Sequence, residues 1–327
     1  GEYASRFTSL TYSAFEKRIL DQFRNTLPED IRPSKDYLIE DWDVIKETLF
    51  KNGVDVNWWR LSQIKEFVES TILNDEYNHK FKNDLLKGTL SNKPVLLYRQ
   101  ITKLATDIIN RNKYIRKALQ TTYEFVFLDE FQDTTEDQYD LLAACFLDSS
   151  CKLTAVGDNK QAIMRWAGAK PDIFPDYIRA FNSNVYQLLM NHRSVPKLVE
   201  FQKEFHQILN KDTNIIQIND YPEFQEGEIT LFEFDNEITE AKVIAIDIES
   251  KIQSGVRPSE ICILAKQKVD DYSSKLIAIL RSKRIKARIE NEYQEILKDP
   301  TCNLLLDLIS CSQGKRDPLI WENLSIF

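Results

Sequence analysis

The sequence predicts an α/β protein built on a parallel sheet, and three apolar runs that end in polar residues carry this prediction. The runs cover residues 125–128, 153–156 and 185–190, and polar side chains follow each of them at once. A helix between the first two runs would complete a βαβ unit, in which the two strands are parallel. Their polar ends then lie on one edge of the sheet, where open α/β sheets bind ligands.

The first βαβ unit can be traced residue by residue. Residues 125–128 are apolar and rich in β-branched and aromatic side chains, which predicts a buried strand. Residues 134–148 follow as a predicted helix with Thr134 or Thr135 as its N-cap. Its apolar positions recur at helical spacing, and they are Leu141, Leu142, Cys145 and Phe146.

Two adjacent carboxylates, Asp129 and Glu130, end the first strand. A carboxylate at a strand end can hold Mg²⁺ together with the phosphates of a substrate, and its neighbour can orient and deprotonate a water molecule. An ordinary solvated strand end is the alternative for such a pair taken alone. The polar loops that follow the next two strands favour a site that hydrolyses a nucleotide.

Several segments resemble motifs of the UvrD/Rep-like superfamily 1 DNA helicases. Residues 129–133 (Asp-Glu-Phe-Gln-Asp) resemble the Walker B element, and residues 156–169 and 191–194 resemble the third and fourth motifs in the same order and spacing. Residues 10–20 are similar, more weakly, to the Thr-Phe-His-Ser segment. The resemblance implies a RecA-like P-loop NTPase motor domain, with a parallel sheet and helices on both of its faces.

The resemblance also implies an interrupted domain order. The first motor domain would comprise residues 1–23 and 119–208, with a helical insert subdomain at 24–118 between them. A linker at 209–227 would lead to the start of a second RecA-like motor domain at 228–327. In that last part we expect strands at 229–234 and 261–265 with a helix at 241–254 between them.

ATP and Mg²⁺ are the implied cofactors. Carried over by motif, Asp129 binds the metal, Glu130 polarises the attacking water, Gln161 senses the γ-phosphate and Arg193 contacts it. Asp158 is counted with the nucleotide-binding residues, and His192 stands where a Tyr often stacks on the nucleotide base. For Gln161 outside this motif, plain solvation would be the preferred interpretation.

Single-stranded DNA and duplex junctions are the implied partners. Trp166 and Tyr12 match aromatic residues that stack on bases, and Met164 and Arg165 lie beside Trp166. Met164 replaces a usual Tyr and Ala167 replaces a usual Arg, so we expect weaker binding of single-stranded DNA at this loop. A tryptophan packed in the core is the alternative for Trp166.

No Gly-x-x-x-x-Gly-Lys-Ser/Thr phosphate loop occurs in these 327 residues, which include only eight glycines. In the family this loop precedes the segment matched by residue 11, and further motifs follow the part matched by residue 327. We therefore expect the chain alone to be inactive as an ATPase. The first functional hypothesis is an ATP-dependent helicase moving 3′ to 5′ on single-stranded DNA. The alternative is a catalytically inert helicase-like interaction module in a nuclease, repair or phage-defence complex.

Composition limits the remaining classes. The net charge of −8 argues against a histone-like basic DNA binder, although a local groove on an acidic protein can still bind nucleic acid. No apolar run is long enough to span a bilayer. The five cysteines lack Cys-x-x-Cys spacing, which favours reduced thiols. A cytoplasmic protein without membrane contact is expected.

Overall fold

The structure is a computed structural model, and it describes residues 7–51, 93–210, 217–218, 227–266 and 268–314, together with residues 65, 320 and 324. It divides into two compact units. The first comprises residues 1–192 and 201–219, and the second comprises residues 193–200 and 220–327. Much of the predicted insert and of the predicted linker lies outside the described residues, so the boundaries at 24–118 and 209–227 stay predictions.

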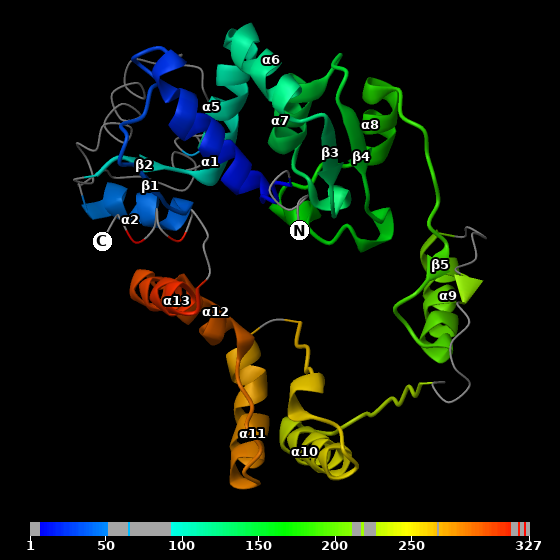
Figure 1. Ribbon diagram of the computed structural model, residues 1–327. Helices are drawn as coiled ribbons and strands as arrows, with labels where there is room; N and C mark the ends of the chain where they lie inside the picture. Colours follow the sequence, from blue (N-terminus) through cyan, green and yellow to red (C-terminus); the bar gives the residue numbers. More distant parts are fainter. Residues whose placement is uncertain are drawn as a thin grey trace. The chain divides into compact units, whose positions relative to one another are not determined.

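Within the described residues, three short parallel strand pairs, β1 with β2, β3 with β4 and β5 with β6, lie among the helices up to residue 218, and helices follow from residue 237 onward (Figure 1). The elements up to residue 155 are α1 (Tyr12–Phe23), η2 (Arg24–Thr26), β1 (Leu38–Ile39), α2 (Trp42–Lys51), β2 (Val95–Leu96), α5 (Tyr98–Arg111), α6 (Lys113–Thr122), β3 (Phe125–Leu128), η3 (Phe131–Asp133), α7 (Glu136–Phe146) and β4 (Lys152–Ala155). The later elements are η4 (Asn159–Gln161), η5 (Arg165–Ala167), α8 (Ile173–Phe181), β5 (Met190–Asn191), α9 (Pro196–Asn210), β6 (Gln217–Ile218), α10 (Glu237–Gln253), η6 (Pro258–Glu260), α11 (Val269–Ser282), α12 (Glu290–Lys298) and α13 (Pro300–Ser312).

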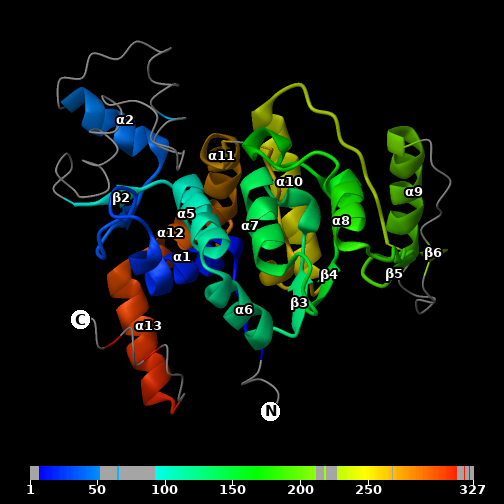
Figure 2. The ribbon, with the colours of Figure 1, turned by 90° about the horizontal axis from the view of Figure 1, so that it is seen from above.

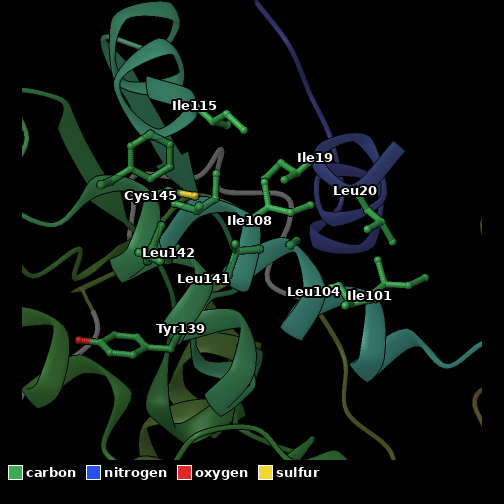
Figure 3. Packing of buried hydrophobic residues seen from close by; sticks show 14 of the residues in the cluster. Ile19, Leu20, Ile101, Leu104, Ile108, Ile115, Tyr139, Leu141, Leu142 and Cys145 are labelled. Atoms are coloured by element: carbon green, nitrogen blue, oxygen red, sulfur yellow. The ribbon is translucent and has the colours of Figure 1, made fainter. Parts of the chain in front are cut away.

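The core of the first unit forms where α5 packs against both α1 and α7. Apolar residues spaced three or four apart give each helix one buried face, and these faces meet around Ile108 of α5 (Figure 3). Ile19 and Leu20 approach from α1, and Leu141 and Leu142 approach from α7. All five side chains are at most 4% exposed. This core holds the strands and turns that carry the predicted site.

The predicted βαβ unit is confirmed. Strands β3 and β4 pair in parallel, with Phe125 opposite Lys152 and Leu128 opposite Ala155. They lie between α7 and α8 in both ribbon views (Figures 1 and 2). Of the two N-cap candidates for α7, the structure selects Thr135, whose hydroxyl accepts a hydrogen bond from the Gln138 amide. The Gln138 side chain in turn accepts one from Thr135 N, so the helix begins with a reciprocal capping box.

The prediction that residues 125–128 form a buried strand was wrong for one face of the strand. Val126 and Leu128 pack against the core, whereas Phe125 is 53% exposed and Phe127 is 68% exposed. Alternating side chains of a strand point to opposite faces. The described residues cover only the face that carries Val126 and Leu128.

Three further strand predictions were also wrong. Of residues 185–190 only Met190 joins a strand, in the short parallel pair of β5 with β6, and residues 229–234 and 261–265 form no ladder within the described residues. Most side chains of these three runs are exposed, with Tyr186 at 84%, Leu231 at 95% and Leu264 at 90%, although Ile261 is half-buried against the core of the second unit. An apolar, β-branched run favours a strand only where a neighbouring strand and a covering face are present.

The second unit has a small core between α10 and α11. It is formed by Ala241, Ala245 and Ile248 from the first helix and by Leu276 and Leu280 from the second. The helix expected at 241–254 is confirmed, and it begins earlier, at Glu237, after an Asn236 N-cap. None of the helices in the described part of the chain has the length and apolar character needed to cross a membrane.

Candidate nucleotide-hydrolysis site

The carboxyl ends of β3 and β4 lie side by side at one edge of their sheet. The ladder continues past both strands, because Val156 N donates to Leu128 O at 2.8 Å and Phe131 N donates to Val156 O at 3.0 Å. The turn that begins at Asp129 and the loop that begins at Gly157 therefore leave the sheet next to each other. This is the arrangement that the βαβ pattern predicted for the polar residues.

Asp129 and Glu130 both reach solvent at this edge. One carboxylate oxygen of Asp129 accepts a hydrogen bond from Glu130 N at 3.0 Å. Glu130 has a φ of +48°, in the left-handed region that residues other than glycine seldom adopt. Outliers of this kind cluster at functional sites, where the surrounding structure holds them in place.

Gln132 is the residue that ties Glu130 to the neighbouring loop. Its side chain is 2% exposed. The carboxamide nitrogen donates to the Glu130 carboxylate at 2.7 Å, and the carboxamide oxygen accepts from Asp158 N at 3.0 Å. Buried amides are stable only when their hydrogen bonds are satisfied, so both contacts fix how this side chain is oriented.

Gly157 leaves the space that the Gln132 carboxamide occupies. A Cβ atom at this position would lie 2.2 Å from Gln132 Oε1 and 3.0 Å from Phe131 N. Any larger residue would therefore displace the carboxamide or the turn. The close approach of the two segments depends on this glycine.

Asp158 connects the linkage to Gln161. Its carboxylate accepts hydrogen bonds from Lys160 N at 3.0 Å and from the Gln161 carboxamide at 3.2 Å. Glu130, Gln132, Asp158 and Gln161 thus form one chain of contacts across the edge of the sheet. Four nucleotide-site residues were predicted within the segments 129–133 and 156–169. Three of them, Glu130, Asp158 and Gln161, are members of this chain of contacts.

The loop after Gln161 carries exposed apolar side chains. Trp166 is 83% exposed, Ile163 is 75% exposed and Met164 is 36% exposed, while the neighbouring Arg165 also faces solvent. The exposure of Trp166 excludes the alternative of a tryptophan buried in the core. The loop ends at Ala169, which is paired with Thr135.

Tyr12 and Glu16 of α1 both have buried side-chain oxygen atoms. Burial is the main cause that raises the pKa of Tyr12 to about 12 and the pKa of Glu16 to about 7. The hydroxyl of Thr102 on α5 donates to Glu16 at 2.9 Å. Tyr12 thus has its hydroxyl inside the protein, and its expected contact with a DNA base stays a prediction.

The chain passes from the first unit to the second between His192 and Arg193, because the first segment of the first unit ends at His192 and Arg193 belongs to the second unit. The site around Glu130 and Gln161 therefore contains residues of the first unit alone. The expected contacts of His192 and Arg193 with nucleotide stay predictions.

Sequence reasoning missed Gln132, Gly157 and Glu16. Gln132 stands inside the motif, two residues after Glu130, and this closeness was the available signal. Burial decided its role, and burial of a polar residue beside a turn has no periodic signature in a sequence.

Comparison with known proteins finds a helicase domain family and several helicase-related proteins. Residues 61–182 match the family model of the UvrD/REP helicase N-terminal domain. The chain is 28% identical over 266 residues to the exonuclease/helicase subunit RexA of Lactococcus lactis, a match that covers 70% of this chain and 22% of that protein. It is 32% identical over 107 residues to the ATP-dependent DNA helicase Rep of Escherichia coli, covering 32% of this chain and 16% of Rep.

A third relative is the Gabija protein GajB of Bacillus cereus, 32% identical over 142 residues, which covers 42% of this chain and 28% of that protein. The chain spans less than a third of the length of each of these three relatives. The motifs at 129–133 and 156–169 and the parallel pair of β3 with β4 lie within the residues that match the family model. Residues 61–182 therefore match the UvrD/REP helicase N-terminal domain family, and the chain is similar to UvrD/Rep-like helicases over part of its length.

Proposed function

We propose that this chain is part of an ATP-dependent DNA helicase or translocase, in which a RecA-like motor domain couples hydrolysis of Mg²⁺-ATP to 3′-to-5′ movement on single-stranded DNA. One observation carries the proposal. Glu130 and Gln161, which the motifs assign to hydrolysis, are linked at one sheet edge by a chain of hydrogen bonds, and the neighbouring Asp129 accepts a hydrogen bond from Glu130 N. The similarity to Rep, whose name includes ATP-dependent DNA helicase, supports it.

Glu130 is the residue proposed to act on water. Its carboxylate is exposed at the sheet edge and is held on one side by the Gln132 carboxamide at 2.7 Å. A carboxylate oriented in this way can accept the proton of an attacking water molecule, which typically contributes about 10²–10⁴ in rate. The left-handed backbone at Glu130 is strained, and strain of this kind is retained where it orients a functional side chain.

Asp129 is suited to Mg²⁺ rather than to a metal bound by protein side chains alone. Within the described residues no three metal-ligating side chains come together. Mg²⁺ is usually held by one or two carboxylates and completes its shell with phosphate oxygens and water, so a single exposed carboxylate fits. When bound, the ion would neutralise charge on the transferred phosphate.

Trp166 is the proposed contact with single-stranded DNA. Its indole is exposed only five residues after Gln161. The loop that carries both residues is hydrogen-bonded through Asp158 N and Lys170 N to the turn at residues 129–134. Stacking on an aromatic side chain is worth about 1–3 kcal/mol per base and tolerates any sequence. A γ-phosphate sensor on the same loop as a base platform would let hydrolysis change the grip on one nucleotide.

An inert helicase-like module is the second candidate. The absence of a Gly-x-x-x-x-Gly-Lys-Ser/Thr run in the 327 residues favours it, as does similarity to a protein named as an exonuclease/helicase subunit. Such a module would bind a nuclease partner without turning over ATP.

Phosphate release by the natural protein at its full length, with and without single-stranded DNA, separates the two candidates. A motor hydrolyses ATP faster when DNA is present, and it displaces a strand from a duplex with a 3′ single-stranded tail but not from one with a 5′ tail. DNA-independent background hydrolysis at every DNA concentration would refute the motor and support the inert module.

A further inference from the structure

We propose that Gln132 is a positioning residue that holds the Glu130 carboxylate and the start of the Asp158–Gln161 loop as one rigid piece. This inference rests on the proposed hydrolytic function and adds to it a residue that acts through Glu130. It is carried by the two hydrogen bonds of the buried carboxamide and by the space that Gly157 leaves for it.

The chemistry of a carboxamide makes this linkage directional. Only its NH₂ group can donate to the Glu130 carboxylate, and only its oxygen can accept from Asp158 N–H. A flipped amide would face oxygen against the carboxylate and nitrogen against an N–H donor. Gln132 therefore has one productive orientation, and that orientation fixes one oxygen of Glu130.

The turn that carries Gln132 is itself anchored. Phe131 is fully buried and contacts the rings of Phe174 and Tyr177 edge-on, with centroids 5.5 Å and 5.1 Å away. Phe131 N donates to Val156 O at 3.0 Å, directly before Gly157. The carboxamide thus extends from a position that core packing has already fixed.

The loop is clamped to the same turn at its other end. Lys170 N donates to Thr134 O at 2.9 Å, and the Lys170 ammonium pairs with Glu136 at 2.7 Å and Asp176 at 3.0 Å. Gln161 and Trp166 lie in the segment between Asp158 N and Lys170 N, the two points at which the loop is hydrogen-bonded to the turn. A displacement of the Glu130 turn would therefore reach both ends of the segment that carries them.

Gln132→Met in the natural protein tests the role, because methionine keeps the length and bulk of the side chain but forms neither hydrogen bond. We expect kcat for DNA-stimulated ATP hydrolysis to fall by about 10²-fold, the lower end of what a positioned base contributes, while KM for ATP changes by less than about threefold. The matched control is Gln120→Met, which removes a carboxamide that donates to Cys145 O at 2.9 Å, outside this linkage.

A double-mutant cycle shows whether Gln132 acts through Glu130. In a Glu130→Gln background, adding Gln132→Met should lower the residual, unstimulated single-turnover rate by less than about twofold, because the group that Gln132 positions has already lost its function. Gly157→Ala displaces the same carboxamide from the opposite side and should show the same pattern. Independent, multiplicative losses would overturn the positioning role while leaving the proposed function intact.

Hydrogen exchange at Asp158 N–H tests the contact without any activity. In the 327-residue chain, Gln132→Met should speed this exchange by at least about tenfold relative to the Gln120→Met control, since the amide loses its acceptor. Unchanged exchange would overturn the linkage. Absence of hydrolysis in the unmodified natural protein would instead refute the proposed function.

Discussion

Glu16→Gln should stabilise the protein at alkaline pH and leave its stability nearly unchanged at acidic pH. Glu16 is 1% exposed, and loss of solvation raises its pKa from 4.5 to about 7 in the folded protein, an effect that hydrogen bonds from Thr102 and Gln138 reduce and the charge of Asp137 increases. The folded state therefore binds the proton of this carboxyl group more tightly than the unfolded state does.

The sign of the pH dependence follows from this difference. Below pH 4.5 the group is protonated in both states, and the folded state carries no penalty. As the pH rises from about 4.5 through about 7, the unfolded state loses this proton while the folded state still holds it, so the free energy of unfolding falls across this window and stays at its lower value above it. A difference of this size corresponds to about 3 kcal/mol at about 1.36 kcal/mol per pKa unit.

Urea denaturation at pH 5 and pH 8 measures the effect. Glutamine keeps the shape and the acceptor for Thr102 but cannot ionise, so the variant should gain up to about 3 kcal/mol over the parent at pH 8 and much less at pH 5. Glu124→Gln is the matched control, because Glu124 is exposed and resembles Glu16 only in its charge. An equal effect of Glu16→Gln at both pH values would refute the reasoning.

Three further results are expected. Trp166→Ala should weaken binding of single-stranded DNA by about 1–3 kcal/mol in fluorescence anisotropy without lowering the unfolding midpoint, because its indole is 83% exposed; a lowered midpoint with unchanged affinity would contradict this. Phe131→Ala should cost about 3–5 kcal/mol in urea denaturation, whereas Phe127→Ala, at a 68% exposed position, should cost far less; equal costs would show that burial is not the cause. The 327-residue chain alone should release phosphate far below about one per second, because it has no phosphate loop, and faster turnover would show that another segment cradles the nucleotide.

The sequence predicted the parts of the fold that depend on local pattern. Strands β3 and β4 and helix α7 follow from period, apolar content and a capping residue, all of which lie within about thirty residues, while the choice of Thr135 over Thr134 as the N-cap came from the structure. Residues 185–190, 229–234 and 261–265 have the same apolar character and failed as strand predictions. Whether such a run forms a strand depends on a distant partner, and nothing in the run itself specifies one.

The site divides in a similar way. That Asp129, Glu130 and Gln161 gather at one sheet edge could be predicted because strand ends and motifs mark them in the sequence, and their roles in hydrolysis stay predictions. The roles of Gln132 and Gly157 could not be predicted, because they depend on a contact between two loops. The two residues are 25 positions apart in the sequence. A buried amide and a glycine without a positive φ leave no pattern that distinguishes them from ordinary loop residues.

DNA-stimulated ATP hydrolysis by Glu130→Gln tests the central claim most directly, measured on the natural protein together with nucleotide affinity. The carboxamide keeps the shape of Glu130 but cannot accept a proton from water. We expect stimulated hydrolysis to be abolished while nucleotide binding survives, and we expect Glu124→Gln, directly before the start of the same strand, to retain both. Unchanged hydrolysis, or a joint loss of binding and turnover, would contradict the assignment of Glu130 as the residue that activates water.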